Sequence, residues 1–261
     1  MADLEIGITK DGICRITLNR PDALNAVTDE MFDTLAVELP KIGRDAAVRV
    51  VLLGSVGRGF CAGADVKGMK GNASSMPFET RVETLRRRQE AVVALHEMPK
   101  VTIARIQGVA AGAGMALAIA CDLRVAAPQA SFTTAFAKVG FAGDFGITYL
   151  LARIIGPDRA QRLLLTSEKL GARDALAIGL VTHLVEGDLT AEADAISAGL
   201  ASGPVLAHGY IKANIREVES GNFRASLDAE AFRQIRLATS EDHTEAIRAF
   251  AEKRPPVFRG R

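Results

Sequence analysis

The segment AGAGMALAIACD, residues 111–122, carries almost no side-chain chemistry before its last residue. It holds two glycines and five alanines, and it follows the strand-like stretch KVTIARIQG at residues 100–108. Two interpretations are open. The small residues allow a helix to pack closely, or they allow a ligand to lie against the backbone. In the second case, free N–H groups at the start of a helix would supply the chemistry.

A similar pattern occurs earlier in the chain. The apolar run VRVVLLGS at residues 48–55 reads as a buried strand, the glycine-rich stretch GRGFCAGADVKGM follows at residues 57–69, and a helix is predicted from about residue 78 to 98. Two copies of strand, glycine loop and helix predict stacked right-handed β-β-α turns. If the two loops converge, they would form a two-donor pocket for an oxygen that becomes negative.

The remaining patterns predict an α/β protein with a helical end. Alternating residues over 4–19 indicate a strand hairpin, and Thr28 is placed to cap a helix. Beyond residue 158 several helical patterns follow one another. We predict a core domain over residues 1–200 and a C-terminal helical region over residues 201–261.

Composition excludes several classes of protein. Lys plus Arg number 32 and Asp plus Glu number 31, so the net charge of +1 does not favour a nucleic-acid or membrane partner. The odd set Cys14, Cys61 and Cys121 has no metal-binding spacing and is typical of buried thiols in a reducing compartment. No metal is expected, and the acidic N-terminus is unlike a targeting segment. We expect a soluble, cytoplasmic protein.

Four stretches together resemble one family. They are RPDALNAVT (20–28), GFCAGADVKGM (59–69), GVAAGAGMALAIACDLRVAA (108–127) and AFAEKRPPVF (249–258). The chain resembles the crotonase family, the enoyl-CoA hydratase/isomerase superfamily, over nearly its whole length. This resemblance implies the crotonase fold, with a C-terminal region that serves trimerisation and active-site cover. It also implies homo-trimers that often pair into hexamers, and an acyl-CoA thioester as substrate with no separate cofactor.

The resemblance also implies site residues, position by position. The backbone N–H groups of Ala64 and Ala113 correspond to the family's oxyanion donors, with Gly112 beside the second. The positions that correspond to substrate contacts are Ala23, Leu24, Ala62, Asp65, Val66, Phe136, Phe250 and Lys253. The last two are expected to reach coenzyme A across a subunit boundary, and Met69 borders the loop that shapes the acyl pocket. Judged from the residues alone, Phe250 is a core residue and Lys253 a solvated charge.

The chain departs from the family's hydratases at two decisive positions. Where those enzymes carry two glutamates, this sequence has Ala116 and Phe136, and neither can transfer a proton. The candidate acid or base is Asp144 in GFAGDFGIT, residues 140–148. In the single-aspartate ring isomerases and dehalogenases of the family, an aspartate in a similar stretch is the reactive group. The alternative is that Asp144 only caps the following helix.

Three functions remain open on this basis. A lone carboxylate suits double-bond isomerisation of an enoyl-CoA, with Phe136, Phe141 and Phe145 as an apolar wall that excludes water. A hydratase that acts through Asp144 and an ordered water is the second alternative, and dehalogenation is disfavoured because the chain has no Trp. A non-catalytic CoA-ester binding protein is the third.

Overall fold

The protein, a computed structural model that describes residues 2–65 and 76–261, is built on a six-stranded sheet. The strands of this sheet, in spatial order, are β1 (Leu4–Ile8), β2 (Ile13–Leu18), β3 (Val50–Ser55), β4 (Val101–Ile106), β6 (Leu123–Ala126) and β9 (His183–Leu184). β1 and β2 form the predicted antiparallel hairpin, with Leu4 opposite Leu18. The neighbours from β2 to β9 pair in parallel.

Burial on both faces explains why β3 is apolar without a break, since all six of its residues are buried. Val51 and Leu53 pack into the main core beneath α1 (Asp29–Arg44), α2 (Phe78–Glu97) and α3 (Ala113–Ala120). The alternate residues Val50 and Leu52 pack on the other face against α7 (Leu189–Ser202). Parallel sheets covered by helices on both sides show this pattern.

A second, smaller layer of strands turns this sheet into a stack of β-β-α turns. It contains β5 (Val109–Ala111), β7 (Ser131–Thr133) and β8 (Leu170–Gly171), and parallel bridges join Val27 to Ala64 and Cys61 to Ala110. Each turn passes from the large sheet to this layer and then into a helix, for example β4 to β5 to α3. The turn after β6 and β7 leads to α4 (Ile147–Ile155), followed by α5 (Pro157–Thr166) and α6 (Ala172–Ala177). The predicted crotonase fold is therefore confirmed.

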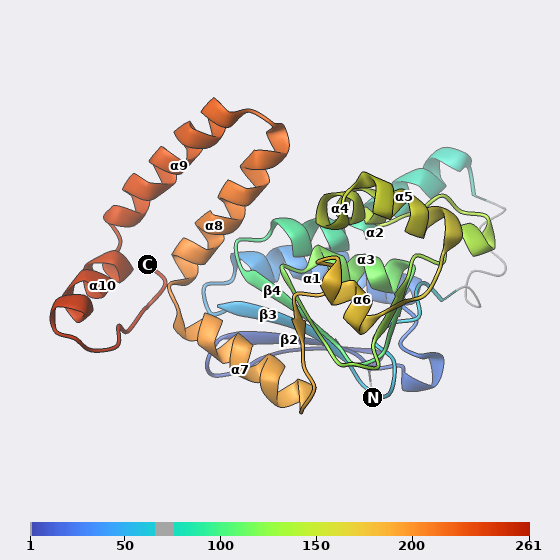
Figure 1. Ribbon diagram of the computed structural model, residues 1–261, viewed down its shortest axis with the longest axis horizontal. Helices are drawn as coiled ribbons and strands as arrows, with labels where there is room; N and C mark the ends of the chain where they lie inside the picture. The colour runs from blue at the N-terminus through green and yellow to red at the C-terminus, as the bar shows by residue number, and fades with distance from the viewer. Residues whose placement is uncertain (1, 66–75) are drawn as a thin grey trace.

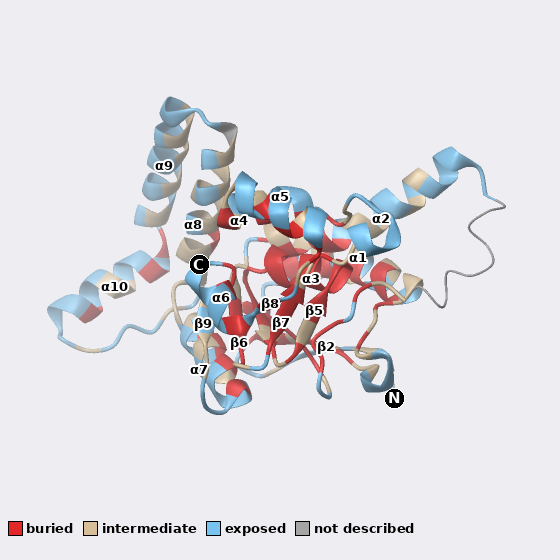
Figure 2. Ribbon diagram, turned by 45° about the vertical axis from the view of Figure 1, so that its right-hand side comes forward, coloured by how far each residue is buried: buried red, intermediate tan, exposed pale blue. Residues whose placement is uncertain are grey.

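The alanine-rich segment at residues 111–122 forms α3 at the centre of the core. All eight residues of α3 are buried, and the helix packs against both α2 and α4 (Figure 2). Small side chains permit this close approach on every side. Within the described residues, no helix is both long and apolar enough to cross a membrane.

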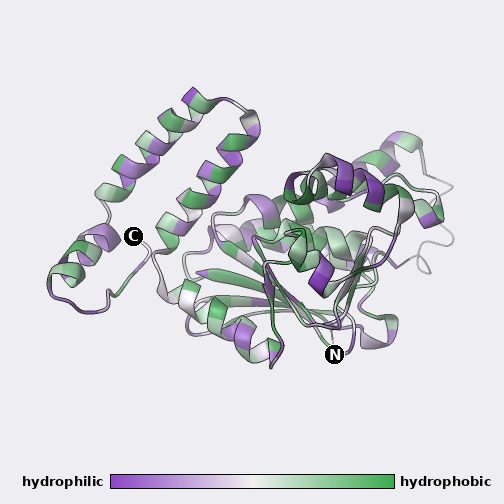
Figure 3. Cartoon of the chain, in the orientation of Figure 1, coloured by the Kyte–Doolittle hydropathy of each residue, from purple (hydrophilic) through white to green (hydrophobic). Residues whose placement is uncertain are grey.

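The last helices form an arm that extends away from the core, and we call residues 205–261 the C-terminal arm (Figure 1). It contains α8 (Val205–Glu217), α9 (Phe223–Ala238) and α10 (Glu241–Ala251). None of the described residues of α9 is buried. Apolar and polar residues alternate along the arm, whereas apolar residues gather in the central strands (Figure 3). The arm is confirmed as helical, while the proposed domain boundary at residue 200 stays a prediction.

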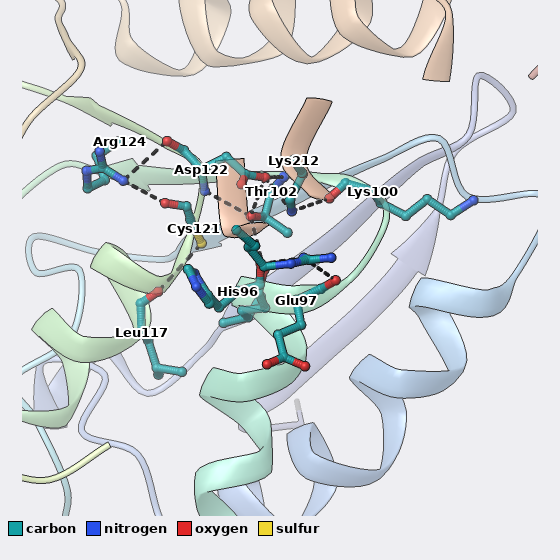
Figure 4. Close-up of polar contacts among 11 residues, drawn as sticks. His96, Glu97, Lys100, Thr102, Leu117, Cys121, Asp122, Arg124 and Lys212 are labelled. Atoms are coloured by element: carbon teal, nitrogen blue, oxygen red, sulfur yellow. Dashed lines mark hydrogen bonds and ion pairs between the residues drawn. The ribbon is translucent and has the colours of Figure 1, made fainter. Parts of the chain in front are cut away.

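A buried ion pair joins the arm to the core (Figure 4). Lys212 of α8 places its Nζ 2.7 Å from the Oδ2 of Asp122, and its side chain is only 9% exposed. The same Nζ donates to the carbonyl oxygen of Lys100 at 2.7 Å, and Asp122 accepts from the hydroxyl of Thr102 at 3.0 Å. Through these contacts, the Oδ2 of Asp122 holds α8 on the core.

Candidate active site

The two glycine-rich loops meet at Gly63 and Gly112. A Cβ built on Gly112 would stand 3.9 Å from the Cα of Gly63, and one built on Gly63 would stand 3.9 Å from the amide nitrogen of Ala113. The φ angles are +110° at Gly63 and +50° at Gly112, a region that residues with a Cβ rarely adopt. The predicted convergence of the two loops is therefore present in the structure.

Two main-chain N–H groups beside this contact have no acceptor among the described residues. In the parallel bridge between Val27 and Ala64, the hydrogen bonds run through the flanking residues: Val27 donates to Gly63, at 2.8 Å, and Asp65 donates to Val27, at 2.9 Å. The N–H of Ala64 therefore takes no part in the bridge. Ala113 is the first residue of α3, where N–H groups lack partners within the helix. Among the described residues, neither N–H donates to another protein group.

Gly114 fixes how closely α3 approaches the first loop, and sequence reasoning missed this role. A Cβ on Gly114 would stand 2.5 Å from both the Sγ and the carbonyl oxygen of Cys61. These distances leave no room for any side chain at this position. The spacing of the two free amides therefore depends on Gly114.

Residues 20–28, which we call the early loop, carry the predicted coenzyme A contacts Ala23 and Leu24 and run beside the first glycine loop. Ala62 donates its N–H to the carbonyl oxygen of Leu24 at 3.0 Å, and Ala23 precedes Leu24 at an exposed position. The sequence analysis missed Asn25, which is fully buried and donates from its Nδ2 to the carbonyl oxygens of Val56 and Gly59, each at 2.8 Å. Asn25 therefore clamps the early loop onto the next turn of the stack.

Other predicted substrate contacts lie at varied distances from the two amides. Asp65 is adjacent to Ala64, and its carboxylate lies 2.8 Å from the guanidinium of Arg20. Phe136 borders the second loop, since its Cζ is 4.0 Å from a Cβ built on Gly112. Val66 and Met69 lie outside the described residues.

Phe250 and Lys253 lie on the C-terminal arm, away from the loops of their own chain (Figure 1). The side chain of Phe250 is 88% exposed, so the interpretation as a core residue is wrong within one chain. Lys253 is exposed as well, with its N–H donated to the carbonyl oxygen of Phe250 at 3.2 Å. A single chain therefore does not bring either residue to the two amides.

Asp144 does not cap α4, so the alternative assignment as a helix cap is wrong. The helix begins at Ile147 with Gly146 as its N-cap, and no side chain caps it. The Oδ1 of Asp144 instead accepts two hydrogen bonds, from the Nε2 of Gln89 at 2.7 Å and from the N–H of Phe145 at 2.6 Å. Gln89 comes from α2, and nothing in its sequence context signalled the contact. Among the described residues, no contact links the carboxylate of Asp144 directly to the amide of Ala64 or Ala113.

The apolar wall expected around Asp144 differs from the prediction. Phe145 turns into the core, where its ring stacks on Phe32 with centroids 4.3 Å apart and the side chain is 5% exposed. Phe141 faces outward and is 64% exposed. Phe136 is half-buried at the second loop, so it is the predicted phenylalanine that borders the two amides. At the other hydratase position, Ala116 is fully buried inside α3.

The cysteines behave as buried thiols rather than as reactive groups. Burial raises the pKa of Cys61 and of Cys121 to about 12, and that of Cys14 to about 11. All three are free and buried. In the described part of the chain, no cluster of His, Cys, Asp and Glu side chains has the arrangement of a metal site.

Two cavities occur elsewhere in the chain. One, of about 620 Å³, lies between α10 and residues 254–259 and is bordered by Asp242 and Arg259. The other, of about 440 Å³, lies where β3 and β4 end and is bordered by Arg105 and Asp188. Both are lined by charged groups of both signs. Neither cavity is lined by Ala64 or Ala113. We place the candidate active site at these two residues because of their paired N–H groups.

Comparison with known proteins identifies the class. The profile of the enoyl-CoA hydratase/isomerase family matches residues 8–261. The 1,2-epoxyphenylacetyl-CoA isomerase of Escherichia coli (strain K12) is 35% identical over the full length of both chains. The trans-2-decenoyl-acyl-carrier-protein isomerase of Streptococcus mutans is 30% identical over 96% of both. A crystal structure described as an enoyl-CoA hydratase of Streptomyces coelicolor A3(2) superposes with a TM-score of 0.95 at 40% identity, covering 100% of this chain and 95% of that one.

The chain therefore belongs to the enoyl-CoA hydratase/isomerase family, and it is an enzyme of that family. Relatives with hydratase names and relatives with isomerase names both match along nearly the whole chain. The reaction of this particular chain must be argued from its own residues.

Proposed function

We propose that the protein isomerises the double bond of an enoyl-CoA thioester. The amides of Ala64 and Ala113 hold the thioester oxygen, and Asp144 carries the proton. The observation that carries this proposal is a pair of N–H groups at the contact of Gly63 with Gly112, for which the described part of the chain offers no acceptor. Such donors stabilise an enolate oxygen, and loss of one typically raises the barrier by about 3 kcal/mol.

The missing glutamates favour isomerisation over hydration. Two-glutamate hydration needs carboxylates at positions where this chain has Ala116 and Phe136. A lone carboxylate can remove a proton beside the thioester-conjugated system and return it one or two carbons away. The charge of the intermediate dienolate would reside on the oxygen held by the two amides. The isomerase names of two full-length relatives support this assignment.

The substrate is proposed to be an acyl-CoA thioester, and no separate cofactor takes part. Ala23, Leu24, Ala62 and Asp65 lie along the early loop and the first glycine loop, where the coenzyme A moiety would bind. The exposed ring of Phe250, with Lys253 nearby, would complete the site of a neighbouring subunit in a homo-trimer or hexamer. No nucleic acid or membrane partner is part of the proposal.

We also place the enzyme in the cytoplasm. Its three cysteines are free and buried, as is typical of proteins in a reducing compartment.

One experiment separates the candidate functions. The protein is given 2-enoyl-, 3-enoyl- and aromatic acyl-CoA thioesters in heavy-oxygen water, and the products are analysed by mass spectrometry and NMR. We expect the double bond to move without uptake of the oxygen label. Uptake of the label would identify a hydratase and contradict isomerisation, and tight binding without conversion would identify a CoA-ester binding protein.

A further inference from the structure

The two oxygens of the Asp144 carboxylate have different surroundings. Oδ1 accepts from the Nε2 of Gln89 at 2.7 Å and from the N–H of Phe145 at 2.6 Å. Within the described residues, no donor contacts Oδ2. Hydrogen bonds to an ionised carboxylate are among the stronger ones in proteins, so the two donors fix the plane of the carboxyl group.

Both donors belong to segments that pack against the core. Gln89 lies on α2, which packs against α1 and α3, and Val92 one turn later on the same helix reaches within 3.8 Å of a Cβ built on Gly146. Phe145 is held by its ring, which stacks on Phe32 of α1. The carboxyl group of Asp144 is therefore tied to two different helices through one oxygen.

We propose that Gln89 is a positioning residue of Asp144. Its hydrogen bond holds Oδ1 in place, so that Oδ2 is the oxygen that takes and returns the proton. This inference rests on the proposed isomerisation. An amide suits the role because it donates an N–H and neither gains nor loses a proton near neutral pH. Gln89 therefore orients the base without competing with it.

The proton transfers balance without any co-reactant. A lone pair of Oδ2 takes the proton from the substrate carbon, and the electron pair of that C–H bond moves into the dienolate, whose oxygen the amides of Ala64 and Ala113 hold. Oδ1 becomes the carbonyl oxygen of the neutral acid and still accepts both N–H groups. The O–H bond at Oδ2 then breaks as a C–H bond forms at the other carbon, and the carboxylate is restored.

The test replaces the donor by an apolar side chain of similar length, in Gln89→Met. We expect kcat to fall roughly 10- to 100-fold with KM within about twofold, because a misplaced reacting group costs about that much. In heavy water, under single turnover, the product should also take up more deuterium, because the freed carboxyl group can rotate and exchange its proton. Turnover is normalised to the concentration of CoA-ester sites found by titration, so unfolded protein does not imitate the effect.

Glu90→Gln is the matched control, since Glu90 is an exposed neighbour on the same helix. It should leave kcat and deuterium uptake unchanged. If Gln89→Met leaves kcat and deuterium uptake unchanged while Asp144→Asn is inactive, the role of Gln89 is overturned and the proposed isomerisation stands. Full activity of Asp144→Asn would overturn the proposed isomerisation together with this inference.

Discussion

Gly114 lies so close to Cys61 that the backbone of α3 touches the first glycine loop with no side chain between them. A Cβ at Gly114 would stand 2.5 Å from the Sγ and from the carbonyl oxygen of Cys61, and 2.6 Å from its Cβ. Two of these three atoms are tied to the backbone and cannot rotate away. The contact therefore sets the distance between the two loops that carry the free amides.

Gly114→Ala should consequently destabilise the protein and abolish turnover. We expect the free energy of unfolding to fall by about 3 kcal/mol, the upper end for an overpacked core, because backbone must move. Gly199→Ala is the matched control: Gly199 is an exposed helical glycine with no atom near a built Cβ. That change should stabilise by about 0.5–1 kcal/mol. Denaturant unfolding measures both, and equal stability of the two variants would refute the close contact.

Asp144→Asn should remove most of the turnover and leave binding intact. The amide keeps the size of the carboxylate but cannot accept and return a proton, so kcat should fall roughly 10²- to 10⁴-fold. Binding of a CoA ester, measured by calorimetry, should change little. Asp158→Asn, at an exposed position in the first turn of α5, is the control and should keep full activity. An Asp144→Asn enzyme that works at the original rate would leave the proposed mechanism without a base.

Lys212→Met should weaken the attachment of the C-terminal arm. The change leaves Asp122 without its cation in a mostly buried setting, which costs about 3 kcal/mol. Lys41→Met is the comparison, because Lys41 forms a pair of the same length, 2.7 Å, with Glu38 on the surface. That pair should contribute about 0–1 kcal/mol. If the two variants lose the same free energy of unfolding, the ion pair of Lys212 with Asp122 contributes no more than a surface pair.

The arm should assemble with other copies of the chain. Phe232 and Ile235 on α9 are 71% and 69% exposed, a large apolar area for a surface that faces water. We expect the native protein to sediment as a trimer or hexamer at micromolar concentration, and Phe232→Asp with Ile235→Asp to sediment as smaller species. Leu165→Asp alters a residue of α5 with 69% exposure and should leave assembly unchanged. A native protein that sediments as a monomer would contradict the proposed completion of the site by Phe250.

The three thiols should resist modification in the native protein. Burial raises the pKa of Cys61 and Cys121 to about 12 and that of Cys14 to about 11. At about pH 8, where an ordinary thiol is partly ionised, almost no thiolate forms at these residues. A thiol reagent should therefore label none of them before unfolding and all three in denaturant. Rapid labelling of a thiol in the native protein would contradict its burial, and labelling of Cys61 would show that the core opens at the first glycine loop.

Much of the fold could be predicted because its signals are local. The unbroken apolar run of β3 indicated a strand covered on both faces, and Thr28 does cap α1 by accepting the N–H of Met31 at 3.2 Å. The position of Asp144 relative to α4 could not be predicted in this way. Phe145 and Gly146 both have positive φ, so the helix starts later than the Asp residue suggested.

The contacts within the candidate site were harder to predict because they join distant segments. Gln89 and Asp144 are 55 positions apart, and their contact depends on how α2 lies beside the 144–146 segment. The neighbourhood of Gly114 and Cys61 likewise arises only when two turns of the stack are superposed. Resemblance could propose Ala64 and Ala113 because their motifs are continuous in sequence, whereas these pairings have no continuous motif.

The donors at the candidate site are main-chain atoms, and this has a consequence for how the site can tolerate mutation. An N–H group is present whichever residue other than proline occupies a position, so an exchange at half-buried Ala64 leaves the donor in place. Gly63, Gly112 and Gly114 have no such freedom, because a positive φ or a 2.5 Å approach excludes a side chain. Around the two amides, steric constraint thus falls on glycines that contribute no reactive group, and a change of side chain at position 64 alone would say little about whether a relative has kept its activity.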